Sequence, residues 1–341
     1  MQSAASASAP NAGWGAFSRL FIGVVAVLLP VLVGLLYLVD PYGTGRSPVL
    51  DTAEVRKQGV RTEHASRARN MDFNAAIFGN SRMQPMMPER LSQLTGARFV
   101  SLTVPGSGPL EQLTLLDWYL RHRQAPPRAL VLGIDSYWCT GNPEMPTWNP
   151  FPFWLYDSNP LVYAGGLLRF SALEEGFRRL QHSFGSRDSS RPDGYWDYEP
   201  SYISQGFEQP EIRARLDKPN PVGVINETGR FPALEALAEK LNTLPQETQV
   251  VLVSPPHYVT GWPAPGGAEA STLQACHARL AQLTAARSNT RWVNWSTDRP
   301  ENHDKEQFFD QVHYRLPVAR LLEDDIARTL TEMPQTPATG R

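Results

Sequence analysis

A continuous apolar segment near the N-terminus constrains this chain most strongly. Residues Leu20 to Val39 contain no charged side chain, and as a helix they would be about 30 Å long, the thickness of a bilayer's hydrocarbon core. A buried helix of a soluble domain and a cleaved signal peptide are the alternatives. A signal peptide has a shorter apolar region followed by a cleavage site of small residues, whereas DPYG follows here at residues 40–43. We therefore expect an uncleaved transmembrane anchor over residues 19–40.

Charge does not fix the side of the membrane on which the rest of the chain lies. Arg19 is the only charged side chain before the apolar segment, and four basic residues follow it, Arg46, Arg56, Lys57 and Arg61. This count favours a cytoplasmic C-terminal part, because cytoplasmic flanks carry the excess of Lys and Arg. Large domains, however, cross the membrane largely regardless of charge, so the count decides little.

Composition and motifs exclude several classes of function. The 341-residue chain has a net charge of −2, so it has no general attraction for nucleic acid, and we expect no nucleic-acid partner. It contains no P-loop and no dinucleotide-binding glycine pattern, and we expect no cofactor. The two cysteines, Cys139 and Cys276, lack zinc-site spacing, so we expect no metal. The sequence leaves open whether they pair or remain free thiols.

Short apolar runs alternate with helical patterns after residue 72. The runs are mostly continuous, which is typical of strands buried on both faces of a parallel sheet. We expect strands at Ala75–Phe78, Phe99–Val104, Ala129–Ile134, Val250–Val253 and Arg291–Trp295, with helices at 88–94, 110–120, 231–241, 273–286 and 317–330. The predicted fold class is therefore α/β, a flavodoxin-like three-layer fold with a mainly parallel five-stranded sheet.

These patterns divide the chain into segments. We expect a disordered tail over 1–18, the anchor over 19–40, a polar connector over 41–71, the α/β domain over 72–332 and a flexible tail over 333–341. The stretch 137–222 is rich in aromatics and proline and interrupts the alternation. It is expected to be an insertion over the carboxyl ends of the strands, where open α/β folds bind ligands. A packing element without a ligand is the alternative.

Two distant segments of this domain carry the residues of a nucleophilic site. Ser81 follows Gly79 at the end of the first expected strand, and Asp310 and His313 lie just before the last expected helix. A serine hydroxyl needs a base to take its proton, and a histidine oriented by a carboxylate supplies that base. Each pattern alone is common in turns and on surfaces. Their positions after the first and the fifth strand favour a Ser-His-Asp site.

With these segments the chain resembles the SGNH/GDSL hydrolase superfamily, in particular its membrane-anchored bacterial members associated with cell-surface polysaccharide acylation. Gly79-Asn80-Ser81 is similar to the family's Gly-Asp-Ser block, and Asp310 and His313 match its Asp-x-x-His block. The family's second block donates a glycine N–H, which the resemblance assigns to Gly106 in VPGSG at 104–108. The N–H groups of Ser81 and Gly106 would then contribute to an oxyanion hole.

The family's third block, Gly-x-Asn-Asp, is altered here. Its asparagine completes the oxyanion hole, but the equivalent residue is Asp135, in GIDS at 133–136. An ionised carboxylate has no proton to donate. Arg82 or a side chain from the 137–222 stretch is expected to replace the missing donor. Asn80, Arg82 and His257, which follow the first and fourth expected strands, are the candidates for substrate contact.

The resemblance implies one of two functions. The first is a serine esterase or O-acyltransferase that acts on acylated cell-surface polysaccharide through an acyl-enzyme on Ser81. It would be a single-pass protein of the bacterial inner membrane with its domain in the periplasm, and a membrane acyltransferase is a candidate partner. The second function is a catalytically weakened scaffold that binds polysaccharide or an assembly partner. Asp135 favours the scaffold, while Ser81, Asp310 and His313 oppose it.

Overall fold

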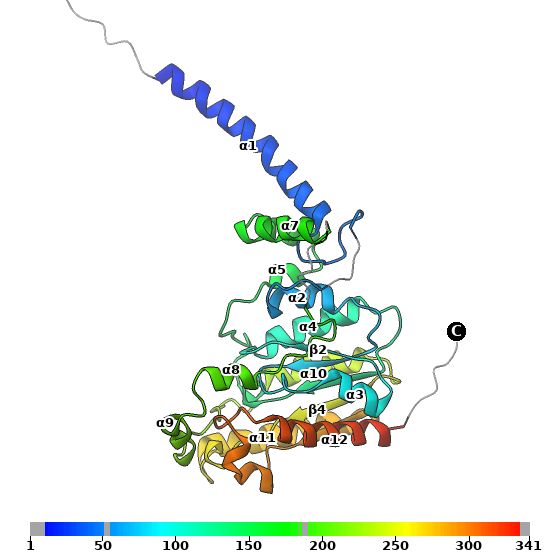
Figure 1. Ribbon diagram of the computed structural model, residues 1–341, viewed down its shortest axis with the longest axis vertical. Helices are drawn as coiled ribbons and strands as arrows, with labels where there is room; N and C mark the ends of the chain where they lie inside the picture. Colours follow the sequence, from blue (N-terminus) through cyan, green and yellow to red (C-terminus); the bar gives the residue numbers. More distant parts are fainter. Residues whose placement is uncertain (1–10, 51–54, 184, 186–189, 335–341) are drawn as a thin grey trace, which may run out of the picture. The chain divides into compact units, whose positions relative to one another are not determined.

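The computed structural model describes residues 11–50, 55–183, 185 and 190–334, except for the side chains of residues 11–13. The chain forms two compact units. The first is drawn from residues 1–52 and 157–187, and the second from residues 53–156 and 188–341. The first unit contains the apolar N-terminal helix, and the second contains the β-sheet (Figure 1).

The second unit is built on a five-stranded, all-parallel sheet with the order β2-β1-β3-β4-β5. Every residue of the first four strands is buried, as expected for apolar runs that are covered on both faces. The prediction of an α/β fold with five strands is thus confirmed. The strands are β1 (Ala75–Gly79), β2 (Phe99–Thr103), β3 (Ala129–Gly133), β4 (Gln249–Ser254) and β5 (Thr290–Asn294).

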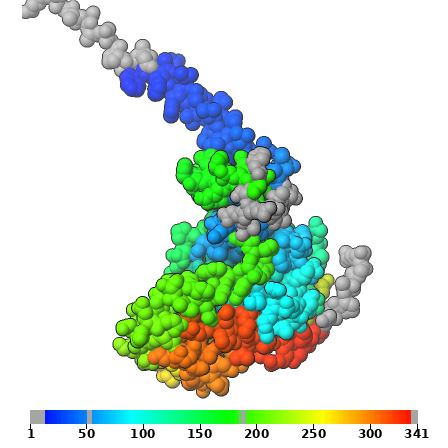
Figure 2. All heavy atoms as spheres, viewed as in Figure 1, coloured from blue at the N-terminus to red at the C-terminus, as the bar shows by residue number. Residues whose placement is uncertain are grey.

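The longer helices of this unit pack on the sheet. α3 (Pro88–Thr95) and α12 (Leu316–Glu332) contact each other and contribute to one core cluster with strand residues. α4 (Pro109–Arg121) contacts β1 and α10 (Pro232–Thr243), while α11 (Ala268–Ala285) contacts β5 and α10. All of these except α11 have proline in their first two positions, where its missing N–H costs no helical hydrogen bond. The C-terminal orange-to-red segment lies at the surface (Figure 2).

The carboxyl ends of the strands share one edge of the sheet, because all five strands are parallel. Gly79 pairs with Thr103 near the end of β1 and β2, and Ser254 pairs with Asn294 at the end of β4 and β5. The loops after β1 and β2, together with residues 308–314 before α12, form one part of this edge, which we call the Ser81 half. The loops after β3 and β4, with Ser296 after β5, form the other part, which we call the Asp135 half.

The expected polar connector over 41–71 contains a buried helix, α2 (Val60–Arg67). Its polar side chains are buried because they bond to one another and to the sheet. His64 is 1% exposed and its Nε2 lies 3.0 Å from the Thr103 carbonyl, while Arg67 pairs with Glu63 at 2.8 Å. The prediction of a polar connector is therefore wrong for residues 60–67, whose polar side chains are largely buried.

The stretch 137–222 does not form one compact insertion, because residues 157–187 belong to the first unit and its flanks to the second. Several of its aromatic side chains, among them Trp138, Tyr156 and Tyr198, are fully buried and fill the interior. The remaining short elements of the second unit are α5 (Phe153–Tyr156), α8 (Glu199–Ser204), α9 (Pro210–Arg213) and the 3₁₀ turns Ser136–Cys139, Ala214–Asp217, Val259–Gly261, Pro300–His303 and Lys305–Gln307.

The first unit consists of α1 (Asn11–Val39), α6 (Pro160–Gly166) and α7 (Phe170–Ser183) with their connections. The segment Trp14–Val39 of α1 is long and apolar enough to span a membrane. The helix begins at Asn11, inside the tail that was expected to be disordered over 1–18. The rest of that tail, residues 1–10, and residues 335–341 of the expected C-terminal tail lie outside the described residues.

Cys139 and Cys276 form a disulfide, which resolves the alternative that the sequence left open. The bond joins the turn after β3 to α11 and connects residues 137 positions apart. Cross-links that close long loops typically stabilise a domain by about 2–5 kcal/mol. The disulfide therefore fixes the Asp135 half of the sheet edge to a helix on the sheet.

Candidate active site

Ser81 lies in the turn that follows β1, and the residue at which the strand enters this turn must be glycine. Gly79, the last residue of β1, has a φ of +151°, and a Cβ atom there would lie 2.5 Å from Met83 Cγ. Both the backbone conformation and the available space exclude larger side chains. The Met83 N–H closes the turn by donating to the Asn80 carbonyl at 3.0 Å. Ser81 is thereby held just beyond the strand, where it is partly exposed.

The structure brings Ser81, His313 and Asp310 into one hydrogen-bonded chain. Ser81 Oγ lies 2.8 Å from His313 Nε2, and His313 Nδ1 lies 2.8 Å from Asp310 Oδ2. The other oxygen, Asp310 Oδ1, accepts hydrogen bonds from the backbone N–H groups of Val312 and His313 at 2.9 and 2.8 Å. Burial alone would raise the pKa of Asp310, but these bonds from His313 and the backbone outweigh it and hold the pKa below its ordinary value.

Aromatic residues that the sequence did not single out support this chain. Tyr314, next to His313, donates its hydroxyl to the Arg82 carbonyl and so ties the histidine loop to the serine turn. Tyr198 donates to the Tyr314 carbonyl, and the rings of Tyr198 and Tyr202 lie 6.0 and 5.0 Å from the His313 ring. These contacts restrict the imidazole to one orientation. No spacing pattern in the sequence connects residues 198–202 with His313, so only folding reveals them.

Two backbone N–H groups near Ser81 are available to a ligand. Within the described residues, neither the Ser81 nor the Gly106 N–H donates a hydrogen bond. Their loops are joined where the strands end, because the Val104 N–H donates to the Gly79 carbonyl at 2.9 Å. Gly106 has a φ of +64°, a conformation that glycine adopts without cost. Unpaired N–H groups at such a turn suit a developing oxyanion.

A side-chain amide lies beside Gly106. Asn149 Nδ2 donates to the Gly106 carbonyl at 3.2 Å, and Asn149 is exposed. An amide nitrogen carries two hydrogens, so one remains for another acceptor. Asn149 belongs to the 137–222 stretch, from which the sequence argument expected a replacement donor without identifying it.

Asp135 is buried and accepts hydrogen bonds through both oxygens. Oδ1 accepts from the Tyr137 N–H at 2.9 Å, and Oδ2 accepts from the Asn80 side-chain amide. Burial raises the pKa of Asp135, against the opposing effect of Arg82 and of these two hydrogen bonds. The amide oxygen of Asn80 accepts in turn from the Arg82 N–H at 3.1 Å. The bond to Asp135 therefore fixes the Asn80 side chain, and Asn80 in turn fixes the backbone of the turn that carries Ser81.

Arg82 is buried and links the two halves of the sheet edge through hydrogen bonds. Its Nη2 donates to the carbonyls of Pro255 and Pro256 at 2.7 and 2.9 Å and lies 3.3 Å from His257 Nδ1. Arg82 is only 5% exposed, so the structure does not place its guanidinium as a free oxyanion donor. Burial, together with the charge of Arg82, holds the pKa of His257 well below its ordinary value. His257 is therefore neutral.

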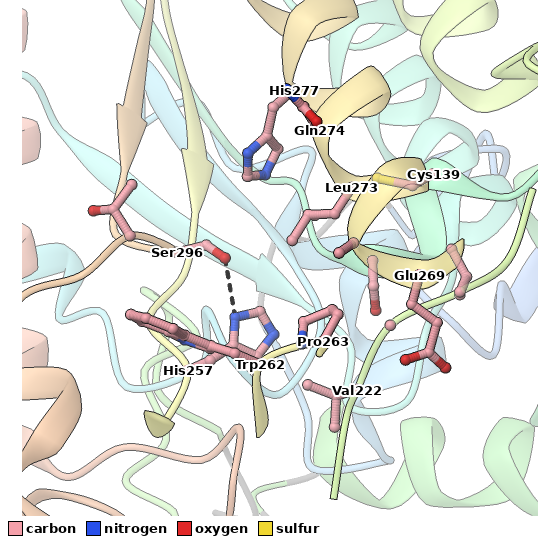
Figure 3. A pocket seen from close by; sticks show the side chains of 15 residues that line it. Cys139, Val222, His257, Trp262, Pro263, Glu269, Leu273, Gln274, His277 and Ser296 are labelled. Carbon is pink, nitrogen blue, oxygen red and sulfur yellow. Dashed lines mark hydrogen bonds between the residues drawn. The ribbon is translucent and has the colours of Figure 1, made fainter. Parts of the chain in front are cut away.

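A cavity of about 330 Å³ lies in the Asp135 half (Figure 3). His257 lines it and is anchored by Ser296, whose Oγ lies 3.2 Å from His257 Nδ1. His257 Nε2 and Trp262 Nε1 are buried and have no hydrogen-bond partner in the described structure. Glu269 and Gln274 add polar groups to a mainly apolar wall. The cavity thus offers nitrogen groups to a ligand with polar oxygens.

Across the described ranges, no three His, Cys, Asp or Glu side chains are grouped so that they could hold a metal ion. The site described above consists of protein groups only.

No protein-family model matches the chain, and no curated protein matches it.

Proposed function

We propose that the protein is a serine ester hydrolase or O-acyltransferase that works through an acyl-enzyme on Ser81. The hydrogen-bonded chain of Ser81, His313 and Asp310 carries this proposal. In such a chain the histidine accepts the serine proton, and the carboxylate fixes the histidine tautomer and stabilises its protonated form. The partly exposed Ser81 and the unpaired N–H groups of Ser81 and Gly106 supply the remaining parts of an acyl-transfer site.

The proposed reaction has two balanced steps. Ser81 Oγ bonds to the ester carbonyl carbon as its proton passes to His313 Nε2. The bond to the leaving alcohol then breaks, and that alcohol takes the proton from His313. In the second step a water or a sugar hydroxyl gives its proton to His313 and bonds to the acyl carbon. The bond between that carbon and Ser81 Oγ breaks, and Ser81 takes the proton back from His313. Water gives hydrolysis, and the sugar hydroxyl gives transfer.

The oxyanion would be bound by the N–H groups of Ser81 and Gly106, with Asn149 as the third donor. Asn149 lies against Gly106 and keeps one amide hydrogen after bonding its carbonyl. Asp135 is not proposed for this role, because both its oxygens accept hydrogen bonds. One oxyanion donor is typically worth about 3–4 kcal/mol in the transition state.

The proposed substrate is an acylated cell-surface polysaccharide, as the resemblance to SGNH/GDSL hydrolases implies. The strand order β2-β1-β3-β4-β5 supports the proposal of a flavodoxin-like three-layer arrangement. The non-reacting part of the substrate would extend along the sheet edge toward His257 and Trp262, whose buried nitrogens lack partners. Asn80, held by Asp135, would contact the substrate only through a shift of the serine turn. A membrane acyltransferase remains the proposed partner.

We propose that the catalytic unit lies in the periplasm of a bacterium, anchored in the inner membrane by Leu20–Val39. α1 has the length and apolarity of a membrane span. The Cys139–Cys276 disulfide supports an oxidising compartment, because disulfides persist outside the cytosol. A C-terminal alkaline phosphatase fusion should be active in this orientation. An active cytoplasmic reporter at the same position would reverse it.

One observation favours the second candidate function, a scaffold that binds polysaccharide or an assembly partner. Asp135 stands where the resemblance calls for an oxyanion donor and is committed to Asn80 and Tyr137. In that case Ser81, His313 and Asp310 would keep their hydrogen bonds but catalyse no reaction.

Labelling with a fluorophosphonate probe separates the two functions. The full chain should be labelled, Ser81→Ala should not, and Ser136→Ala, which changes another partly exposed serine of the same sheet edge, should be labelled like the parent. A folded protein that stays unlabelled would support the scaffold. Labelling that persists in Ser81→Ala would remove Ser81 from the proposal.

A further inference from the structure

The first unit presents an apolar surface beside the end of the membrane helix. On α7, Phe170, Leu173, Phe177 and Leu180 are 75%, 39%, 63% and 39% exposed. Their spacing of three and four residues places them in one stripe along the helix. Leu161, Val162 and Leu168, from α6 and the α6–α7 connection, are also exposed. We call these seven residues the α6–α7 apolar surface.

α7 has distinct polar and buried faces as well. Ala172, Glu175, Gly176 and Arg179 are buried, whereas Glu174, Arg178 and Gln181 are exposed. The buried residues pack within the first unit, where Gly176 lies against Leu36, Val39 and Pro41. A helix with separate apolar and charged exposed faces is typical of segments that lie in the plane of a membrane surface.

A buried hydrogen-bond network fixes this surface to the end of α1. Asp40, the residue after α1, is fully buried and accepts bonds from the Thr44 N–H, the Thr44 hydroxyl and the Gly45 N–H at 2.8–2.9 Å. It also accepts a bond from the Tyr163 hydroxyl of α6 at 3.1 Å. The Tyr163 ring contacts the Tyr37 ring of α1 at 5.8 Å. α6 and α7 are therefore attached to the last turn of α1 (Figure 1).

The length of α1 sets the depth in the membrane at which its last turn lies. The 26 residues from Trp14 to Val39 span about 39 Å as a helix, against a hydrocarbon core of about 30 Å. The surplus of about 9 Å corresponds to Trp14–Arg19, which lies in the headgroup region on one side, where tryptophan and arginine are enriched. Leu20–Val39 then matches the core and puts the Leu36–Val39 turn at the boundary on the other side. The groups that pack on Leu36 and Val39 lie at the same level.

We infer that the α6–α7 apolar surface binds the lipid bilayer, with α7 lying in the membrane interface on the side where α1 ends. The bilayer is the occupant because this surface is continuous with a helix built to cross it, and because water would otherwise cover seven apolar side chains at lipid level. The surface anchors the first unit at a second point beside the span. This inference is independent of the chemistry proposed for Ser81.

Fluorescence quenching in proteoliposomes tests the inference with the full chain. The native cysteines stay paired, so a single added cysteine can carry an environment-sensitive NBD probe. Phe177→Cys reports the apolar face, and Arg178→Cys, about 100° around the same helix, is its control on the polar face. Val27→Cys, 63% exposed within α1, reports the span. Leu180→Cys repeats the apolar-face measurement if the first variant folds poorly. The quenchers are lipids with a shallow nitroxide, for positions 177 and 178, lipids with a nitroxide near the end of the acyl chain, for position 27, and iodide in the aqueous phase.

Shallow nitroxide lipids should quench the probe at 177 at least about twofold more than the probe at 178, because an interfacial helix buries its apolar face about 5–10 Å deep. Iodide should show the reverse order. Equal, weak quenching at 177 and 178 with strong quenching at 27 by the deep nitroxide would overturn the inference and leave a partner protein as the occupant. Weak quenching at 27 would overturn the membrane anchor together with the inference, while fluorophosphonate labelling of Ser81 would be unaffected.

Discussion

The two halves of the sheet edge use similar residue types in opposite ways. In the Ser81 half, the serine hydroxyl is paired only with His313, and the N–H groups of Ser81 and Gly106 have no acceptor in the described structure. In contrast, Asp135 in the other half accepts hydrogen bonds through both oxygens, and Arg82, which links the two halves, donates through Nη2 to two backbone carbonyls. Groups that remain unpaired at a partly exposed site are available for chemistry, whereas groups that satisfy one another hold the loops in place.

The contrast extends to the two carboxylates. Asp310 faces His313, which also contacts Ser81, and the pKa of Asp310 lies below its ordinary value. Asp135 faces an amide and an arginine, and burial raises its pKa. The position of a carboxylate at the end of a strand therefore does not decide its role; the partner it faces does. The Asp135 half contributes a cavity beside His257 in place of a second reactive group.

His313→Ala should give the largest loss. Without its base, Ser81 retains its proton, and kcat for a simple acyl ester should fall about 10⁴–10⁶-fold. His257→Gln, in the other half, should cost far less because His257 is not within the relay. Steady-state kinetics on folded variants compares them. Equal losses in the two variants would break the distinction between the halves.

Asp310→Asn should fold normally and lose activity by about 10⁴-fold, since an amide can hold His313 in the wrong tautomer. The same substitution at Asp135 provides the comparison. The pH–rate profile of the residual Asp310→Asn activity should differ from that of the parent protein. Near-full activity in Asp310→Asn would show that Asp310 only orders its loop.

Asn149→Ala tests the proposed third oxyanion donor. Removing one donor should lower kcat by about 10²–10³-fold with little change in stability, because Asn149 is exposed. Asn142→Ala, which changes another exposed asparagine of the same loop region, is the control and should behave like the parent. A purely structural Asn149 would change the thermal midpoint and leave the kinetics unchanged.

Asp135→Asn should change kcat by less than about tenfold. It should lower the free energy of unfolding by about 1–3 kcal/mol, because the asparagine amide has one acceptor oxygen whereas Asp135 accepts hydrogen bonds through two. Urea unfolding and ester kinetics measure both effects. A rate increase near 10²-fold would place residue 135 in the oxyanion hole after all.

The pH dependence of stability should have opposite signs for the two carboxylates. Asp310, with a lowered pKa, stabilises the fold above the ordinary value near 3.8, and this contribution is lost as the pH falls through the folded value. Asp135, with a raised pKa, keeps its proton longer in the fold than in the unfolded chain, so its contribution declines as the pH rises from 3.8 through the raised value. Urea unfolding of Asp310→Asn and Asp135→Asn across this range should deviate from the parent in opposite directions. Deviations of one sign would contradict the contrast.

Much of the fold was predictable because its signals are local. The first four strands are short, mainly apolar runs, and the observed bounds of β1 to β5 agree with the predicted ones to within a few residues. α2 was missed for a physical reason: the polar side chains of Glu63, His64 and Arg67 look like a solvated connector but are buried by bonding one another.

The site was predictable in part. The positions of Ser81, Asp310 and His313 could be inferred from their places after strands, and the structure brings them together. Asn149, Tyr198 and Tyr202 could not be inferred, because their contacts with Gly106 and His313 arise from long-range packing that no spacing encodes. Arg82 and Asp135 were located correctly, but only their bonding partners reveal that they serve the scaffold of the turn.

The central claim is that Ser81 carries the acyl group. The most direct measurement incubates the full chain with p-nitrophenyl acetate, quenches it in acid and maps the peptides by mass spectrometry. We expect one acetyl group on Ser81 in the parent protein, and none at that residue in His313→Ala under the same conditions. Acetylation that falls on other residues, or equally on Ser81 with and without His313, would contradict the account.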